Sequence, residues 1–436
     1  MRKKIRSIEM NIYISGISGT GLGPLALMAL DAGIHVTGSD RAEGAITGEL
    51  RRNGIDFYIG DQDGKYLQKK FDEEGIDWFV YTSALPEDHP ELKLAGRLGI
   101  KCSKRDELTA HLVDKLGLEM IAVAGTHGKT TTVSMLTWAA LRLGLPAAYL
   151  VGTTINFAPS GSYKRGDRFF LYEADEYDRN FLNYHPSLSV ITFVSYDHQD
   201  IYPTEADYRA AFEQFEAQSA RVIFAEPGAA PRDMSFLEGK DTEIIEDIDP
   251  RFTLSGKVKR RDATAALHAL KKICDAPDEE LIDILNAFPG VGRRFEKLTD
   301  GIYTDYAHHP EEIEATVEIA SEEASALGKR GVAVIYQPHQ NARQHKVKDG
   351  YKNAFLKADK VYWLPTYLVR EDPGLSVLSP EELISQLSNS DIAEVAGMDD
   401  RLIDEIWKCL KEDLLVVLMS AGPADKWIRD VVKDNF

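Results

Sequence analysis

The fold of this 436-residue chain is decided by the stretch Ala124-Gly125-Thr126-His127-Gly128-Lys129-Thr130-Thr131-Thr132. The apolar segment Glu119–Ala124 is expected to form a strand, and the segment from about Lys129 to Leu143 is expected to form a helix. A glycine-rich turn between a strand and a helix is the setting of a phosphate-binding loop. The sequence therefore predicts an α/β unit that binds a phosphorylated ligand near residue 125.

The chemistry of this loop lies in Lys129 and Thr130. Glycines allow backbone N–H groups to approach phosphate oxygens, and the helix N-terminus adds a partial positive charge. Lys129 can reach the terminal phosphates, and the Thr130 hydroxyl can ligate Mg²⁺, which prefers oxygen ligands. The loop departs from the general motif because Val123 stands where the first glycine belongs. The alternative is a tight strand–helix turn with an incidental lysine.

Outward from this loop, strands, turns and helices alternate along the chain, which favours parallel sheets covered by helices. Asn11–Ser15 is expected to be a strand and Leu22–Ala32 an amphipathic helix. The pattern restarts near residue 115 and again near residue 290. We therefore expect an α/β protein of three domains, which span residues 1–113, 114–289 and 290–436.

Two polar stretches follow expected strands of the middle domain. Glu173-Ala174-Asp175-Glu176-Tyr177-Asp178 comes after Phe169–Tyr172, and Tyr196-Asp197-His198-Gln199-Asp200 comes after Leu188–Val194. The carboxyl ends of parallel strands face one ligand-binding crevice. Glu173 can therefore hold a magnesium ion, and His198 can act as a metal ligand or a general base. The alternatives are a solvated acidic loop and a histidine that is merely hydrogen-bonded.

A second glycine-rich turn, Gly16–Gly23, lies between the first strand and helix, and Asp40 closes the next strand. It resembles a dinucleotide-binding fingerprint, although Ser18 stands where the second glycine belongs. The geometry suits a diphosphate at a helix N-terminus. The alternative is a glycine-rich turn for close packing.

Three loops of the last domain carry arginine and histidine, which can bind phosphates or a carboxylate. They are Gly292–Glu296, Asp305–Pro310 and Gln337–Arg343. The alternative for each is a solvated loop.

Composition excludes several classes of function. The chain has 51 basic and 70 acidic residues, a formal net charge of −19, so bulk charge does not attract nucleic acid. No run approaches the 18 apolar residues of a membrane span. Three dispersed cysteines suggest no disulfide framework, which fits reduced thiols in a cytoplasmic protein. Residues 1–9 are basic, but the Asn11–Ile17 segment that follows is too short and too interrupted for a signal-peptide core. We expect residues 1–9 to be only a short extension before Met10.

Together these motifs, in their order along the chain, resemble the Mur ligase family, whose members are ATP-dependent amide-forming enzymes of peptidoglycan assembly. The matching motifs are Gly125–Thr131, Glu173–Glu176, Asp197-His198, Arg293-Arg294-Phe295 and Asp305–Pro310. The first domain, with Gly16–Gly23 and Gly38-Ser39-Asp40, resembles the branch that takes UDP-N-acetylmuramate. The resemblance implies a Rossmann-like first domain, a central P-loop ATPase-like domain and a Rossmann-like last domain.

The resemblance also implies the chemistry. The lactyl carboxylate of UDP-N-acetylmuramate attacks the γ-phosphate of ATP, and an amine then attacks the resulting acyl phosphate. ATP and Mg²⁺ are the implied cofactors, and the catalytic residues are Lys129, Glu173, His198 and His308. The implied metal ligands are Thr130, Glu173 and His198.

The remaining assignments concern binding. The residues expected to bind ATP are Gly125, Thr126, His127, Gly128, Lys129, Thr130, Thr131, Arg294 and Asp305. Those expected to bind the UDP-sugar are Gly16, Ser18, Gly19, Thr20, Gly21, Asp40 and Ser83. Tyr306, His308 and Arg343 are expected to face the amine substrate.

The sequence leaves the amine open between L-alanine and a murein tripeptide. Gly292–Phe295 and Gln337-Pro338-His339 resemble the enzymes that add L-alanine, whereas Tyr177 and Ala307 resemble the recycling enzymes that add tripeptide. Gln340 stands where alanine-adding enzymes usually carry an arginine, and only Arg343 of that pair remains.

Two other classes of enzyme stay open from the residues alone. A nicotinamide-dependent oxidoreductase would use Gly16–Gly23 and leave the phosphate loop unexplained. A P-loop kinase would use Gly125–Thr131 and leave the first domain unexplained.

Overall fold

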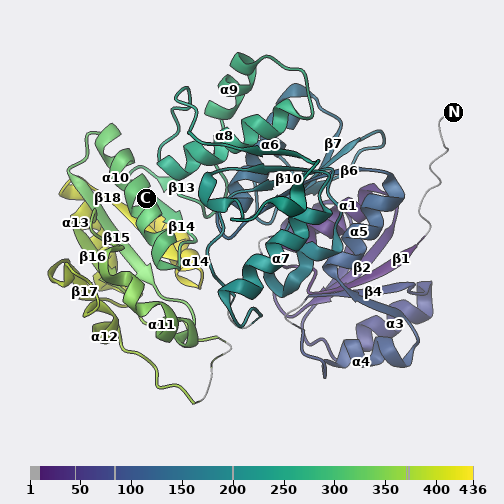
Figure 1. Ribbon diagram of the computed structural model, residues 1–436. Helices are drawn as coiled ribbons and strands as arrows, with labels where there is room; N and C mark the ends of the chain where they lie inside the picture. Colours follow the sequence, from purple (N-terminus) through teal and green to yellow (C-terminus); the bar gives the residue numbers. More distant parts are fainter. Residues whose placement is uncertain are drawn as a thin grey trace. The chain divides into compact units, whose positions relative to one another are not determined.

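The computed structural model describes residues 10–44, 46–82, 85–198, 201–369, 371 and 374–435. The chain forms two compact units. The first unit runs to Phe252 and resumes at Arg261–Pro289, and the second unit comprises Thr253–Arg260 and the chain from Gly290 onward. Two sheets lie in the first unit, drawn in purple to teal in Figure 1, and one lies in the second. Among the described residues, no helix is both long and apolar enough to cross a membrane.

The first sheet has the strand order β3-β2-β1-β4-β5, and its strands are parallel. Its strands are β1 (Asn11–Ser15), β2 (His35–Asp40), β3 (Asp56–Ile59), β4 (Trp78–Tyr81) and β5 (Lys101–Lys104). The accompanying helices are α1 (Gly23–Asp31), α2 (Thr47–Arg52), α3 (Lys65–Glu74), α4 (Pro90–Arg97) and α5 (Arg105–Leu116). The predicted first strand is confirmed, and the glycine-rich turn joins it to α1.

The second sheet has the order β12-β11-β10-β6-β9-β7-β8, and only β8 runs antiparallel to its neighbour. Its strands are β6 (Glu119–Ala124), β7 (Ala147–Leu150), β8 (Gly161–Ser162), β9 (Phe169–Glu173), β10 (Leu188–Ile191), β11 (Arg221–Phe224) and β12 (Asp241–Ile244). Its helices are α6 (Lys129–Leu143), α7 (Glu205–Gln218), α8 (Lys257–Lys271) and α9 (Asp278–Asn286). Because β6 lies between β10 and β9, their carboxyl ends meet at one edge.

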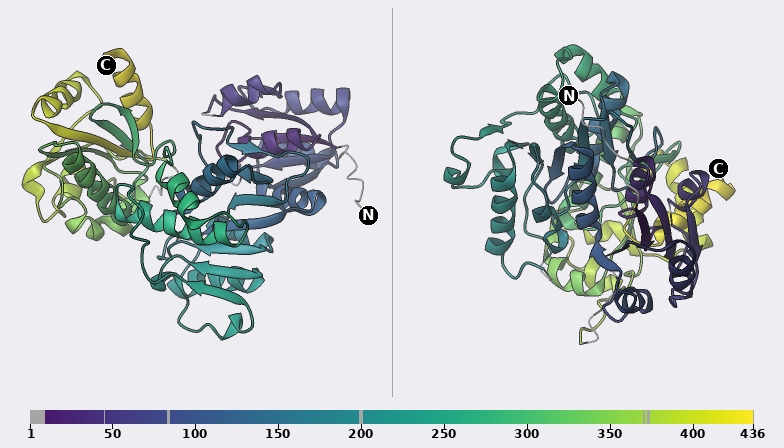
Figure 2. Two further views of the ribbon diagram at one scale, coloured as in Figure 1. Left: turned by 90° about the horizontal axis from the view of Figure 1, so that it is seen from above. Right: turned by 90° about the vertical axis from the view of Figure 1, so that its right-hand side faces the viewer.

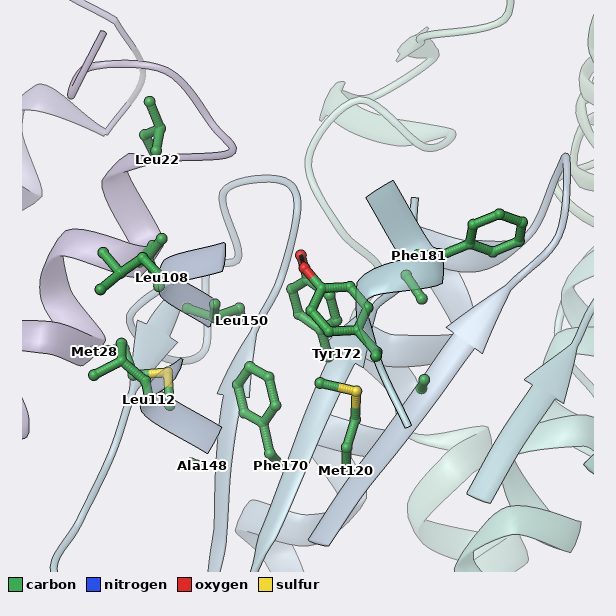
Figure 3. Close-up of a cluster of buried hydrophobic side chains, with 14 of the residues drawn as sticks. Leu22, Met28, Leu108, Leu112, Met120, Ala148, Leu150, Phe170, Tyr172 and Phe181 are labelled. Atoms are coloured by element: carbon green, nitrogen blue, oxygen red, sulfur yellow. Dashed lines mark hydrogen bonds between the residues drawn. The ribbon is translucent and has the colours of Figure 1, made fainter. Parts of the chain in front are cut away.

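The prediction that helix α1 is amphipathic is wrong. Seven of the nine residues of α1, from Gly23 to Ala29, are buried. The cause is tertiary: α1 also contacts β7 and β8 of the second sheet, and a Cβ on Gly161 would lie 2.2 Å from the Pro24 carbonyl oxygen. The two sheets of the first unit therefore share one core, in which Met28 and Phe170 both lie (Figure 3).

The third sheet, in the second unit, has the order β13-β14-β18-β15-β16-β17, with only β13 antiparallel. Its strands are β13 (Glu296–Thr299), β14 (Ile302–Asp305), β15 (Gly331–Gln337), β16 (Lys360–Trp363), β17 (Ala393–Val395) and β18 (Leu414–Ser420). Its helices are α10 (Pro310–Ala326), α11 (Asn341–Val347), α12 (Pro380–Ile384), α13 (Asp400–Lys411) and α14 (Ala424–Asn435). Separate apolar clusters cover its two faces. Figure 2 shows the helices of this unit around the sheet in two further views.

Candidate active site

The phosphate loop lies between β6 and α6, at the bounds predicted for both elements. Gly125 has φ +134°, and a Cβ there would lie 2.2 Å from Thr192 Oγ1 and 2.9 Å from the Phe193 backbone nitrogen. Gly128 has φ +85°, and a Cβ there would lie 2.6 Å from an Asp262 carboxylate oxygen. Both positions therefore favour glycine, because Gly125 packs tightly against the chain that follows β10, Gly128 packs against α8, and both have positive φ.

The other loop residues fix this conformation. The Thr126 backbone N–H donates to the Phe193 carbonyl at 2.6 Å, and its hydroxyl lies 2.8 Å from the Tyr208 hydroxyl. The His127 ring stacks on Phe193 with ring centres 5.8 Å apart. Thr131 is buried in the first turn of α6. Lys129 and Thr130 are the loop side chains that meet the acidic residues at and just after the end of β9.

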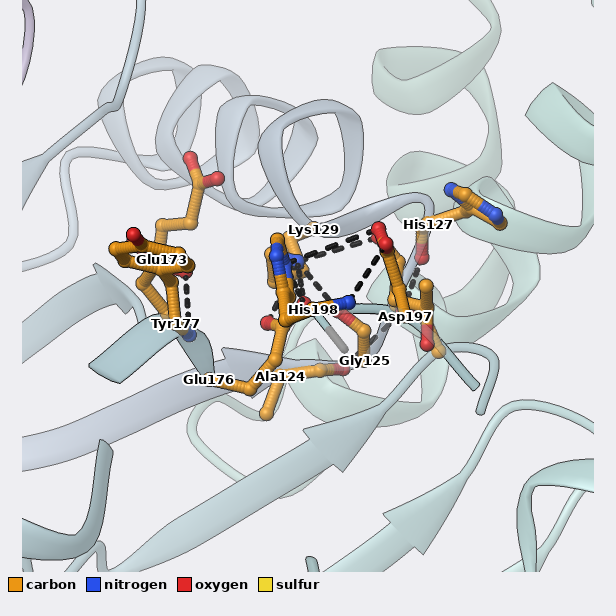
Figure 4. Close-up of polar contacts among 12 residues, drawn as sticks. Ala124, Gly125, His127, Lys129, Glu173, Glu176, Tyr177, Asp197 and His198 are labelled. Carbon is orange, nitrogen blue, oxygen red and sulfur yellow. Dashed lines mark hydrogen bonds and ion pairs between the residues drawn. The ribbon is translucent and has the colours of Figure 1, made fainter. Parts of the chain in front are cut away.

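Lys129 forms a buried ion pair with Glu176 (Figure 4). Its ammonium donates to Glu176 Oε2 at 2.8 Å and to the carbonyl oxygen of Gly125. Burial opposes the charged ammonium, but Glu176, Asp175 and Glu173 together raise the pKa of Lys129. A charged lysine is thus held at the loop, with Glu176 as its buried partner.

Glu176 connects the phosphate loop to His198. Its carboxylate is fully buried, His198 Nε2 lies 3.3 Å from Oε1, and the Tyr202 hydroxyl donates to the Glu176 carbonyl at 2.6 Å. Burial alone would raise the pKa of Glu176, but Lys129 and His198 lower it below its ordinary value. From the sequence alone Glu176 is not distinguished as a site residue, because four acidic residues stand within 173–178 and only the fold buries this one.

Thr130 and Glu173 form the second contact across the site. The Thr130 hydroxyl lies 3.0 Å from Glu173 Oε1 and 3.1 Å from Oε2. Neighbouring oxygen ligands of an octahedral Mg²⁺ ion with bonds of about 2.1 Å are about 3.0 Å apart. This pair therefore fits two ligands of one magnesium ion, both of them oxygens.

His198 has an unusual backbone and a fixed side chain. Its φ is +54°, its N–H donates to the Asp197 carboxylate at 2.7 Å, and its ring meets Tyr177 edge-on. Burial would lower the pKa of His198, but the bond to Glu176 and the charge of Asp197 raise it. The structure thus groups His198 with Glu176 and Lys129. Gln199 and Asp200 of the same stretch lie outside the described residues.

The glycine-rich turn of the first sheet is held by the end of β2. Gly16 has φ +90°, and its N–H and that of Ile17 both donate to the Ser39 carbonyl. The Asp40 carboxylate accepts the Ser18 N–H at 2.9 Å. Asp40 therefore supports the turn. Gly19 and Thr20 are exposed and Gly21 is half-buried at its tip, whereas Ser83 lies outside the described residues.

In the second unit, Asp305 organises two loops. Its carboxylate is buried and accepts the N–H groups of Phe295 at 2.6 Å and Ala307 at 2.7 Å. Burial raises the pKa of Asp305 against the charge of Arg294 and these two bonds. Asp305 thereby holds the Arg294 loop beside the Tyr306 loop, and the Arg294 guanidinium lies 5.5 Å from the centre of the Tyr306 ring. Its expected contact with ATP stays a prediction.

His308 and Arg343 lie near this cluster. His308 Nδ1 lies 3.0 Å from the Tyr306 carbonyl and 3.2 Å from Glu312. Burial lowers the pKa of His308 despite the opposing charge of Glu312, and the positive charge of Arg343 lowers it further, which favours a neutral imidazole. Arg343 is half-buried on α11, which begins after Gln340 with φ +64°. The residues expected at the amine substrate are therefore neighbours within the second unit.

Comparisons with known proteins identify the class. Residues 11–115 match the Mur ligase family, catalytic domain, and residues 293–422 match the Mur ligase, glutamate ligase domain. The chain belongs to the Mur ligase family. It is 30% identical over 451 residues to the UDP-N-acetylmuramate–L-alanine ligase of Lactiplantibacillus plantarum, covering 95% of this chain and 96% of the relative. It is 28% identical over 452 residues to the enzyme of that name from Lactobacillus helveticus, covering 95% of this chain and 97% of the relative.

Solved structures share the fold. The Thermotoga maritima UDP-N-acetylmuramate–alanine ligase matches with a TM-score of 0.77 and 22% identity, over 98% of this chain and 99% of that chain. The Psychrobacter arcticus murein peptide ligase matches with a TM-score of 0.64 and 22% identity, over 97% of this chain and 98% of that chain. The expected three-domain α/β fold is confirmed, and an oxidoreductase or a simple P-loop kinase no longer accounts for the whole chain.

Proposed function

We propose that this chain is an ATP-dependent ligase that joins the lactyl carboxylate of UDP-N-acetylmuramate to L-alanine in the cytoplasm. The observation that carries the proposal is the buried Lys129–Glu176 pair beside Thr130 and Glu173, in a chain whose full-length relatives bear the name of this activity. A charged lysine on a glycine-rich loop is suited to the terminal phosphates of ATP.

The reaction converts a poor electrophile into a good one. A lactyl carboxylate oxygen attacks the γ-phosphorus of ATP, the bond between the β- and γ-phosphates breaks, and ADP leaves. The amine of L-alanine then attacks the acyl carbon, loses a proton, and displaces inorganic phosphate. Lys129 and loop N–H groups offset the charge that develops on the transferred phosphoryl group. Magnesium held by Thr130 and Glu173 would neutralise further phosphate charge.

Residues of the site have separate tasks in this proposal. Glu176 keeps the Lys129 ammonium at the loop until the nucleotide enters, and His198 supports Glu176 from the other side. The Gly16–Gly23 turn holds the uridine diphosphate. Arg343 binds the carboxylate of the amino acid, and neutral His308 is available to accept the amine proton.

A second candidate function differs from the first only in its amine substrate. Gln340 replaces an arginine that alanine-adding enzymes usually carry, and Tyr177 and Ala307 resemble the recycling enzymes. These residues favour a murein tripeptide as the amine substrate.

The test is phosphate release from ATP and Mg²⁺ in the presence of UDP-N-acetylmuramate, with L-alanine, glycine, L-serine or the murein tripeptide. Release with L-alanine, and a product heavier by one alanine residue, is the expected result. Release only with tripeptide would make the chain a recycling ligase. No release with any amine, from a folded protein that binds ATP, would refute both candidates.

A further inference from the structure

Arg105 is a cation at the junction of the two sheets of the first unit. It is the first residue of α5, directly after β5, and its side chain is 24% exposed. Its Nη1 lies 2.6 Å from the position that a Cβ on Gly21 would occupy. Its Nη2 lies 3.6 Å from Asp175 Oδ2. The guanidinium thus faces the glycine-rich turn on one side and the acidic stretch after β9 on the other.

The backbone that carries Arg105 is anchored on both sides. Lys104 pairs with Asp178, and the Asp106 carboxylate accepts a hydrogen bond from Asn183. Both partners lie in the segment that follows β9. Because its two neighbours are fixed, Arg105 is held at the junction whether or not a ligand is present.

The donors of the Arg105 guanidinium are largely unused. A distance of 3.6 Å to Asp175 is an ion pair but too long for a hydrogen bond. Within the described residues, the guanidinium makes no hydrogen bond. An arginine side chain carries five N–H donors in a planar fork, and their partial burial is costly unless an acceptor fills the space. The natural acceptor for such a fork is a phosphate or a carboxylate.

The adjacent turn has unused donors at its Arg105 side. The N–H groups of residues 16–19 already donate hydrogen bonds within the chain, and their acceptors belong to Ser39, Asp40 and Gly16. The N–H groups of Thr20, Gly21 and Leu22 have no partner in the described part of the chain. The Ser18 hydroxyl is also buried without a partner among those residues. Free donors therefore lie at Gly21, against which the Arg105 guanidinium packs, and at its two neighbours in the chain.

We propose that Arg105 binds the diphosphate of the nucleotide sugar, together with the backbone N–H groups of Thr20, Gly21 and Leu22. This inference rests on the proposed function. Nη2 of the Arg105 guanidinium is paired with Asp175, so Nη1 faces the glycine-rich turn. A Cβ at Gly21 would displace the guanidinium from this position, so glycine at residue 21 lets Arg105 approach the turn. In a chain of net charge −19, a local cation of this kind offsets the general repulsion of a dianion.

The test is calorimetric binding of UDP-N-acetylmuramate and of UDP to wild-type protein, Arg105→Ala and Arg105→Lys. Loss of charge-assisted hydrogen bonds should weaken both ligands roughly 10- to 150-fold in Arg105→Ala. Arg105→Lys should show an intermediate loss, because lysine keeps the charge but not the fork. The KM for ATP should change less than twofold. Arg97→Ala, which removes an exposed arginine from α4, is the matched control and should bind both ligands as wild type does.

Three outcomes would overturn the inference. An unchanged Kd in folded Arg105→Ala, with tight wild-type binding, would refute this role and leave the proposed function intact. Weaker binding of UDP-N-acetylmuramate but not of UDP would place Arg105 at the lactyl carboxylate instead. No wild-type binding of either ligand would refute the proposed function and this inference together. If Arg105→Ala does not fold, Arg105→Lys decides by the same comparison.

Discussion

Replacing Lys129 by methionine removes one half of a buried ion pair and should lower both activity and stability. The Lys129 side chain is 13% exposed and that of Glu176 is 1% exposed, so the variant leaves a buried carboxylate without its main cation. Breaking a buried pair in this way costs about 3–5 kcal/mol. His198 remains 3.3 Å from Glu176 and can share the charge, which favours the lower end, about 3 kcal/mol.

The companion variant separates stability from catalysis. Lys129→Met combined with Glu176→Gln replaces the pair by neutral groups of similar volume, which is often neutral for stability. We therefore expect the double variant to regain all but about 1 kcal/mol of wild-type stability, while ADP formation stays below about 1% of wild type because the phosphate-binding charge is absent. Glu176→Gln alone should also be destabilised, because it leaves the lysine buried and unpaired.

The assay is thermal unfolding of all four proteins, with ADP release measured on the same samples. For a unit of about 280 residues, 3 kcal/mol corresponds to a fall in Tm of roughly 5 °C. Lys129→Met that melts with wild type, or a double variant no more stable than the single ones, would refute the buried-pair reasoning. A double variant that forms ADP at the wild-type rate would refute the role of Lys129.

Three further predictions concern the loop, a buried carboxyl and the amine. Gly125→Ala should lower ADP formation at least about tenfold, because its Cβ would meet Thr192 Oγ1 at 2.2 Å in a backbone with φ +134°, a conformation that costs about 1–3 kcal/mol. Burial raises the pKa of Glu216 from an ordinary 4.5 to about 8, so the folded state holds a proton that the unfolded state releases, and stability falls as pH rises from 4.5 toward 8. Glu216→Gln should remove this fall and raise Tm at pH 8. Arg343→Ala should raise the KM for the amine roughly tenfold or more and leave the KM for ATP nearly unchanged.

Each of these has a contradicting result. Wild-type turnover in Gly125→Ala would show that the loop can rearrange. Parallel Tm–pH curves for wild type and Glu216→Gln would show that Glu216 is ionised in the folded protein. An unchanged amine KM in Arg343→Ala would show that the amino-acid carboxylate is bound elsewhere.

Local patterns were sufficient for the elements that carry the phosphate loop. Glu119–Ala124 is apolar and is followed by glycines, and the structure confirms the strand and the helix after it at the predicted bounds. Polar strands lack the apolar run that identifies a strand in the sequence. β5, with the sequence Lys101-Cys102-Ser103-Lys104, is a strand because β4 pairs with it, which no local pattern reveals. The burial of α1 on all sides likewise depends on a second sheet distant in sequence.

The residues of the candidate site were likewise predictable only in part from the sequence. Strand ends predicted the meeting of Thr130 and Glu173, because parallel strands share a carboxyl edge. Burial distinguishes Glu176 from its acidic neighbours, and burial is a property of the packed chain. Arg105 opens an ordinary polar helix and has no motif around it. Only the packing of α5 against the glycine-rich turn and the segment after β9 gives it a site.

Activation of the lactyl carboxylate as an acyl phosphate can be followed with labelled oxygen. UDP-N-acetylmuramate carrying oxygen-18 in its lactyl carboxylate is incubated with ATP, Mg²⁺ and L-alanine, and the released phosphate is analysed by mass spectrometry. We expect one carboxylate oxygen in each phosphate, with amide product in equal amount. Unlabelled phosphate accompanying the amide would show that the carboxylate never attacked the γ-phosphate, and would refute the acyl-phosphate mechanism.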